Sequence, residues 1–293
     1  MEMEENGIME QQRSRKSKGG LITMPFIIAN EAFEKVASYG LLPNMVLYLM
    51  NEYNMGVTKA ANTMFFWSAA TNFMPLIGAF LSDSFLGRFL TISLGSISSL
   101  LGTTLLWLTA TITKARPPQC DQFTQKCKLA SPAQYTFLLS SFGLISIGAG
   151  GIRPCSLAFG ADQLTNRENN PNNERVLESF FGWYYASAAV SVLIALTCVV
   201  YIQDHMGWKI GFGVPALLML FSALLFLVAS SLYVKENANK SLFTGFAQVA
   251  IVAYKNRHLA FPQHDSNNYH YEKGSAYTSP TDKLRSCWVL YER

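Results

Sequence analysis

The chain has 293 residues, of which 50% are hydrophobic and only 14% are charged, and its formal net charge is +4 at pH 7. The apolar residues come in long blocks, which argues against an ordinary soluble domain, and the positive excess is too small and too dispersed to predict nucleic-acid binding. Residues 1–20 include basic residues but lack the short apolar core and small-residue cleavage site of a signal peptide.

Six apolar blocks are each long enough to cross the hydrocarbon core of a bilayer, which takes roughly 20 helical residues. They cover residues 22–50, 60–81, 89–112, 135–152, 179–202 and 212–234. Helices satisfy their own backbone hydrogen bonds in lipid, whereas open strands do not. We therefore expect an all-α integral membrane protein, with a basic tail over 1–20, a six-helix bundle over 21–235 and a polar segment over 236–293.

The first block is the one that carries charges in its interior, at Glu31, Glu34 and Lys35, after about nine apolar or small residues. On a helix these side chains share one broad face. Charges at membrane depth usually face a protein interior or a water cavity and are typical of ion or substrate pathways. Adjacent carboxylates favour proton binding and an ammonium opposes it, so this cluster could bind and release one proton. The alternative is a cluster near a helix start that snorkels to the membrane interface.

A short connection joins the second and third blocks. Asp83 and Arg88 bracket it, and Gly78 and Gly87 stand where backbones must come close. A charge pair here would anchor neighbouring helices of a bundle that rocks between two states. A tight turn without motion explains the same residues.

The fourth block ends with Gly-Ala-Gly-Gly-Ile-Arg-Pro over 148–154. The glycines allow close helix approach, and Pro154 is expected to break or kink the helix just after Arg153. Arg153 would then pair with Glu31 or Glu34 across the bundle. The alternative is an ordinary arginine at a helix end on the cytoplasmic side.

Lysine and arginine in the connections predict the orientation, because cytoplasmic loops carry the excess. One side holds twelve, at positions 13, 15, 16, 18, 88, 153, 167, 175, 235, 240, 255 and 257, and the other holds six, at 59, 114, 116, 126, 128 and 209. Both termini are therefore expected in the cytoplasm. Cys120 and Cys127 then share an outer loop, where a disulfide could persist, and the lack of nearby histidine disfavours a metal site there.

After residue 234 the chain becomes polar. Apolar residues over 241–254 are spaced as in a helix, which predicts an amphipathic helix at the inner membrane face. From residue 256 onward the composition is that of a poorly ordered segment. No second set of spans follows.

Several of these segments together resemble a known family. The loop 78–88 is similar to that between helices two and three of the major facilitator superfamily. Glu-x-x-Glu-Lys over 31–35, followed by Tyr-Gly at 39–40, resembles the Glu-x-x-Glu-Arg proton-coupling motif of proton-dependent oligopeptide transporters. GGIRPC, FGADQ and FFGWYY, at 150–155, 159–163 and 180–185, resemble the plant nitrate/peptide branch. The resemblance runs from about residue 20 to 285.

The resemblance implies that Glu31, Glu34, Lys35 and Arg153 couple transport to protons, and that protonation of the two carboxylates loosens their pairing with the two cations. The family motif often has Arg where this chain has Lys35, and commonly Lys where it has Arg153. Both positive charges are kept, but not the hydrogen-bond geometry, because Arg is a planar fork and Lys a point charge.

Two tyrosines are weaker candidates for the substrate cavity. Tyr39 follows the charged motif and Tyr184 lies in FFGWYY. For Tyr39, a place in an aromatic belt or in packing is equally open.

Length is the larger departure, because family members have about twelve spans in two halves and this chain has six. Residues 281–285 resemble the linker between halves, whereas 286–293 do not resemble its continuation. We therefore expect the amino-terminal half of a proton-coupled secondary transporter of nitrate, peptide or a related small solute. The alternatives are a non-transporting interaction partner of full-length transporters and a non-functional truncated product.

No enzyme is predicted, because the four histidines are dispersed and no nucleophile lies near a base in sequence. The expected partners are protons, a small solute, the lipid bilayer and a full-length relative, with no cofactor, metal or nucleic acid. Multi-pass insertion with both termini in the cytoplasm is expected, and the plasma membrane is favoured over the vacuole.

Overall fold

The computed structural model describes residues 19–118, 128–165, 173–235, 250–251 and 254–255. The chain divides into two units, Met1–Ala238 and Asn239–Arg293. Most of the predicted basic tail, residues 1–18, lies outside the described residues. So do Cys120, Cys127 and nearly all of the segment after 235. The regular structure of the described residues is entirely helical.

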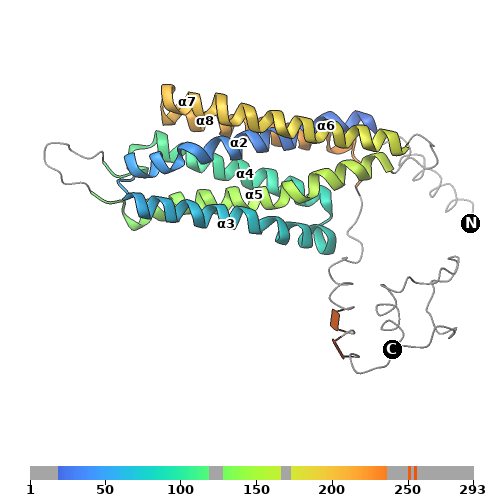
Figure 1. Cartoon of the computed structure of the whole chain (residues 1–293), viewed down its shortest axis with the longest axis horizontal. Helices are drawn as coiled ribbons and strands as arrows, with labels where there is room; N and C mark the ends of the chain where they lie inside the picture. Colours follow the sequence, from blue (N-terminus) through green and yellow to red (C-terminus); the bar gives the residue numbers. More distant parts are fainter. Residues whose placement is uncertain (1–18, 119–127, 166–172, 236–249, 252–253, 256–293) are drawn as a thin grey trace, which may run out of the picture. The chain divides into compact units, whose positions relative to one another are not determined.

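Long helices of the first unit run side by side along a common direction (Figure 1). In chain order they are α2 (Met24–Asn51), α3 (Val57–Leu81), α4 (Arg88–Thr111), α5 (Pro132–Thr165), α6 (Asn173–Ile194), α7 (Val200–Met206) and α8 (Trp208–Val228). A π-helical turn, Ser82–Leu86, prolongs α3, and another, Ala195–Val199, joins α6 to α7 without a break. Three single turns of 3-10 helix lie at Leu21–Thr23, Thr113–Ala115 and Ala229–Ser231.

Five of these helical segments are long and apolar enough to cross a membrane: Val57–Leu86, Arg88–Thr111, Pro132–Leu164, Glu174–Met206 and Trp208–Ser231. The remaining predicted span, the first in the chain, corresponds to α2, which has 28 residues and carries Glu31, Glu34 and Lys35. The all-α membrane fold expected from the sequence is therefore confirmed, and α2 differs from the other long helices in the charges that it carries.

The predicted end of the fourth span is wrong, because α5 continues through Pro154 to Thr165. Proline lacks the N–H that would bond to the carbonyl four residues earlier, which is that of Gly150. This carbonyl lies against Gly78 of α3, so close that any side chain at Gly78 would collide with it. Gly78 lets α3 approach the Gly150 carbonyl, which has lost its N–H donor, and α5 continues through Pro154.

A seam of small residues joins α4 to α5. A Cβ atom added to Gly95 would stand 3.0 Å from the carbonyl oxygen of Gly148, and one added to Gly102 would stand 2.8 Å from the Ile145 side chain. Small residues allow such close backbone approach in membrane helix pairs. The remaining packing places α8 against α2 and α4, and α6 against α2.

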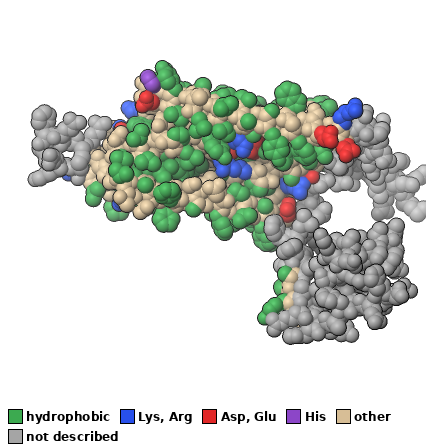
Figure 2. All heavy atoms as spheres, viewed as in Figure 1, with side chains coloured by type: hydrophobic (Ala, Val, Ile, Leu, Met, Phe, Trp, Pro, Cys, Tyr) green, Lys and Arg blue, Asp and Glu red, His purple; other side chains and the backbone are tan. Residues whose placement is uncertain are grey.

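Two aromatic clusters lie in the core of the bundle. Tyr48 packs edge-on against Phe212 at 4.7 Å between ring centroids, and Phe159 packs against Tyr233 at 5.2 Å. Hydrophobic side chains also cover most of the visible outer face, and a small group of charged side chains lies near its middle (Figure 2). Charged side chains therefore interrupt an outer face that is otherwise mostly apolar.

Candidate functional site

The charged cluster of α2 is buried. Glu31 is 2% exposed and Glu34 is fully buried, whereas the Lys35 side chain retains 17% exposure. Lys35 Nζ lies 3.0 Å from Glu31 Oε1, one helical turn away on the same helix. The first carboxylate of the motif is therefore neutralised locally, within α2.

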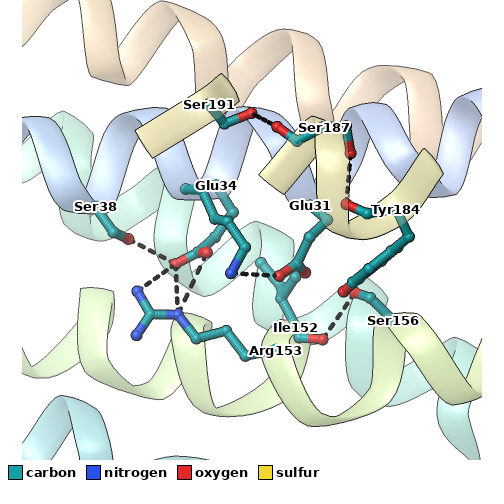
Figure 3. A network of polar contacts seen from close by, with 10 residues as sticks. Glu31, Glu34, Ser38, Ile152, Arg153, Ser156, Tyr184, Ser187 and Ser191 are labelled. Atoms are coloured by element: carbon teal, nitrogen blue, oxygen red, sulfur yellow. Dashed lines mark hydrogen bonds and ion pairs between the residues drawn. The ribbon is translucent and has the colours of Figure 1, made fainter. Parts of the chain in front are cut away.

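The second carboxylate is neutralised from another helix. Arg153 of α5 places Nη2 3.1 Å from Glu34 Oε1, and its Nε lies 3.3 Å and 3.4 Å from the two carboxylate oxygens (Figure 3). Of the two partners that the sequence left open for Arg153, the structure selects Glu34. Because α5 extends beyond Pro154, Arg153 stands inside the bundle and not at a helix end.

Further side chains surround this ion pair. Ser38 donates a hydrogen bond of 2.6 Å from Oγ to Glu34 Oε1, and the Arg153 guanidinium carbon lies 5.5 Å from the centroid of the Tyr39 ring. Tyr184 is 5% exposed and reaches from α6 toward the side of the network that holds Glu31 (Figure 3). The site therefore draws on α2, α5 and α6.

The important chemical property of this site is that its positive and negative charges balance. Two carboxylates and two cations occupy one small region, so each buried charge has an opposite neighbour. Loss of one charge, by protonation or substitution, leaves its partner uncompensated, which is costly away from water. Only the Glu34–Arg153 pair would then change the attraction between two helices, since Lys35 and Glu31 belong to the same one.

A second ion cluster lies at the end of α3. Gly87 has a φ of 77°, a conformation that favours glycine, and it joins the π-helical turn directly to α4. Arg88 Nε lies 3.7 Å from Asp83 Oδ1, whereas its Nη1 lies 2.6 Å from both carboxylate oxygens of Asp162 on α5. The nearer partner of Arg88 is therefore Asp162, a residue for which no role was predicted.

Two polar residues that sequence reasoning missed also position these helices. Asn30 is 1% exposed, and its Oδ1 accepts hydrogen bonds from Ser96 of α4 at 3.1 Å and Ser222 of α8 at 2.7 Å. Gln163 binds the backbone of Val234 through its side-chain amide, as both donor and acceptor. Asp162 and Gln163 lie in the FGADQ segment, the signal that could have pointed to them.

No group of three or more His, Cys, Asp or Glu side chains that could hold a metal ion occurs within the described part of the chain. Of the cysteines there, Cys155 is buried and Cys198 is exposed.

Comparison with known proteins adds a family to this geometry. A family model described as "PTR2: POT family" matches residues 89–286. Protein NRT1/PTR FAMILY 1.2 of Arabidopsis thaliana is 62% identical over 281 residues, and NRT1/PTR FAMILY 1.1 of the same plant is 62% identical over 274. These alignments cover 94% and 92% of this chain but 46% of each relative, so the chain spans about half their length.

Solved structures share the fold at low sequence identity. The POT family transporter PepTSo matches 85% of this chain with a TM-score of 0.64 and 20% identity, which covers 44% of that structure. An auto-inhibited POT family peptide transporter matches 80% of this chain with a TM-score of 0.60 and 22% identity, covering 46% of its own length. The six-segment bundle is thus similar to about half of a POT fold.

Proposed function

The chain belongs to the POT family, and from that premise we propose that it acts as the amino-terminal half of a proton-coupled secondary transporter. Its solute would be nitrate, a peptide or a related small molecule. Its relatives are named as NRT1/PTR family members, and one of the similar solved structures is named as a peptide transporter. The proposal also places both termini in the cytoplasm, the segment 236–293 as a cytoplasmic linker, and the protein in the plasma membrane.

One observation carries this proposal: the buried ion pair between Glu34 of α2 and Arg153 of α5 at 3.1 Å. A proton bound by Glu34 removes the negative charge that holds Arg153, so the two helices lose an electrostatic link. Arg153 keeps its charge and becomes available to an anionic group of the solute. Binding of the proton, release of the helix and binding of the solute are thereby joined at one side chain.

The other proposed residues act around this link. Lys35 keeps Glu31 neutralised within α2, and Tyr39 and Tyr184 line the neighbouring space from two helices. Arg88, with Asp83 and Asp162, fixes the end of α3 to α5 across the turn at Gly87. Gly78 contributes the close approach of α3 to α5.

Proton-driven uptake by vesicles that contain only this chain tests the proposal. We expect accumulation of nitrate or of short peptides under an inward proton gradient, which collapses when a protonophore is added. Glu34→Gln should reduce accumulation to the level without a gradient. The matched control is Asp204→Asn, which changes a carboxylate that is 72% exposed and lies outside the network, and which should leave uptake unchanged.

A second candidate function is supported by the apolar surface. Phe65 and Phe66 of α3 are 73% and 78% exposed. Only 11% of the apolar stretch within the segment Val57–Leu86 is buried. Such a surface would suit a non-transporting partner of full-length relatives. Inactive vesicles, together with co-purification of a co-expressed full-length relative, would favour this function over transport, whereas rapid degradation of the chain in cells would indicate a non-functional fragment.

A further inference from the structure

The start of α2 and the ends of α5 and α8 meet at one glutamine, at the same end of the bundle (Figure 1). Gln163 of α5 is 1% exposed, and its side-chain Nε2 donates to the carbonyl oxygen of Val234 at 2.9 Å. Its Oε1 accepts a hydrogen bond from the N–H of Val234 at 2.8 Å. Its backbone carbonyl oxygen accepts one from the N–H of Gly20 at 2.9 Å. Gln163 therefore binds both the segment that enters α2 and the segment that leaves α8.

The entering and leaving segments also bind each other. The N–H of Gly19 donates to the carbonyl oxygen of Leu232 at 2.8 Å. Gly19 has a φ of 83°, a conformation that favours glycine. A Cβ atom added there would stand 3.0 Å from Val234 Cγ2 and 3.1 Å from the carbonyl oxygen of Gln163. These contacts define a clamp of three segments, which consists of Gly19, Gly20, Gln163, Leu232 and Val234.

The clamp and the Glu34–Arg153 pair join α2 and α5 at two heights. Gln163 lies ten residues after Arg153 on α5, which corresponds to about 15 Å along the helix. Glu34 lies ten residues after the start of α2, which is also about 15 Å. Ile27 of α2 and Phe159 of α5 are 1% and 2% exposed and belong to one apolar cluster. The two helices are therefore packed together over the length that separates the clamp from the ion pair.

The clamp and the ion pair differ in what can break them. A proton or an uncharged side chain at Glu34 removes the charge that holds Arg153. The clamp consists of hydrogen bonds between an uncharged amide and the backbone, so a proton at Glu34 leaves its groups unchanged. The helix between Arg153 and Gln163 is continuous, so a displacement of Arg153 away from α2 would be transmitted to the clamp.

We propose that Gln163 is a positioning residue for the Glu34–Arg153 pair, because it fixes the end of α5 at the height that brings Arg153 to Glu34. Separation of the pair in turn loosens the clamp on both chain segments, since coupling between two sites is reciprocal. The neighbouring Asp162 binds Arg88 of α4, so the clamp adds α2 and α8 to an end of α5 that is already fixed to α4. The proposal rests on the proposed function only for the role of a proton in separating the pair.

Hydrogen–deuterium exchange of the full chain in detergent measures the effect of the pair on the clamp. Glu34→Gln should raise exchange of the Gly20 and Val234 amides roughly tenfold, within the range of about 5–150-fold that is typical of coupled sites. The matched control is Glu52→Gln, which also removes an ion-paired carboxylate, the partner of Arg116, at the other end of α2. It should leave exchange of both amides as in the wild type.

Carbodiimide labelling measures the effect of the clamp on the pair. A hydrophobic carbodiimide reacts with a protonated carboxyl group and not with an ion-paired carboxylate, so modification of Glu34 reports its separation from Arg153. Gln163→Ala should raise this modification roughly fivefold. The control is Gln203→Ala, because Gln203 is 2% exposed and donates to the Gly40 carbonyl of α2 at 2.9 Å, but lies outside the clamp. It should leave the labelling unchanged.

Unchanged exchange in Glu34→Gln, or unchanged labelling in Gln163→Ala, would overturn the proposal, because coupling has to act in both directions. Equal effects of a variant and its control would also overturn it, since the whole bundle would then have loosened. If Gln163→Ala does not fold, exchange in Glu34→Gln still decides, because that variant keeps every residue of the clamp. Neither measurement uses transport, so a failure of uptake by vesicles would overturn the proposed function without affecting this result.

Discussion

The two carboxylates of the α2 motif have different structural roles although they lie three residues apart. Glu31 pairs with Lys35 on its own helix, so this pair moves as a unit with α2. Glu34 pairs with Arg153 on α5, so this pair joins two helices. A movement that carries α2 away from α5 would therefore break the second pair and leave the first intact.

Single and double substitutions should separate the destabilisation caused by a lone buried charge from the contribution of the Glu34–Arg153 pair to stability. Glu34→Gln or Arg153→Gln alone leaves one buried charge, at a cost of about 3–5 kcal/mol. The double variant removes both charges and should unfold at a higher temperature than either single variant in detergent. A double variant whose loss equals the sum of the two single losses would contradict this account of the pair.

Ser38 should stabilise the same carboxylate from within α2. Its hydroxyl donates to Glu34 Oε1 at 2.6 Å, and hydrogen bonds to charged groups contribute about 1.5–3 kcal/mol. Ser38→Ala should therefore lower the thermal midpoint of the chain, and Ser38→Thr, which restores a hydroxyl, should recover most of the loss. Ser187→Ala is the control, because that hydroxyl donates only to the backbone oxygen of Tyr184. Equal losses at Ser38 and Ser187 would argue against a particular role for Ser38.

The predicted disulfide lies outside the described residues, but the base of its loop is described. Asn54, which has a φ of 51°, donates through Nδ2 to the carbonyl oxygens of Pro118 at 3.1 Å and Lys128 at 3.0 Å. One side chain thus holds both ends of the segment that contains Cys120 and Cys127. We propose that these two cysteines form a disulfide.

Alkylation of the unfolded chain measures this pairing. The chain has five cysteines, so a single disulfide predicts three alkyl groups before reduction and five afterwards. Peptide mapping should place the two additional groups at Cys120 and Cys127. Their alkylation without reductant, in protein isolated under non-reducing conditions, would show free thiols and refute the pairing.

At the scale of elements, the seam between α4 and α5 depends on the absence of side chains. A Cβ atom at Gly148 would stand 2.5 Å from Ser99 Cβ and 2.8 Å from the carbonyl oxygen of Gly95. Gly148→Val should therefore cost about 1–3 kcal/mol through overpacking and lower the thermal midpoint. Gly143→Val lies on the same helix beside open space and should not. Equal destabilisation of both variants would mean that the valine itself, and not the seam, is at fault.

The helices and the shared face of the α2 charges could be predicted from the sequence because both follow from short-range periodicity. The partner of Arg153 could not, since it depends on how α2 and α5 are rotated against each other. The length of α5 was mispredicted because proline usually ends a helix, whereas here Gly78 leaves room for the carbonyl that Pro154 releases. The Arg88–Asp162 pair was missed for the same reason, since Asp162 lies in the part of α5 beyond that proline.

At the scale of the whole molecule, the number of spans decides where the two ends of the bundle lie. Within the described residues, five segments meet the criteria of length and hydropathy for a span, and α2 is long enough but charged. If α2 also crosses the membrane, the six spans place both ends on one side, whereas five spans would place them on opposite sides. The ion pairs of Glu31 and Glu34 support crossing, because both carboxylates are neutralised inside the bundle.

Reporter fusions measure this topology. Arg153 stands inside α5, so it leaves the charge tally, which becomes eleven against six and still favours a cytoplasmic location for both ends. A reporter before residue 19 and one after residue 235 should both be active in the cytoplasm, and one inserted in 119–127 should be active outside.

Lys35→Gln leaves Glu31 without its cation and is the variant most expected to impair insertion of α2. The control is Lys209→Gln, which changes an exposed lysine that forms no ion pair among the described residues. Wild-type reporters on opposite sides would show that α2 does not span, and the transport proposal would fail with it.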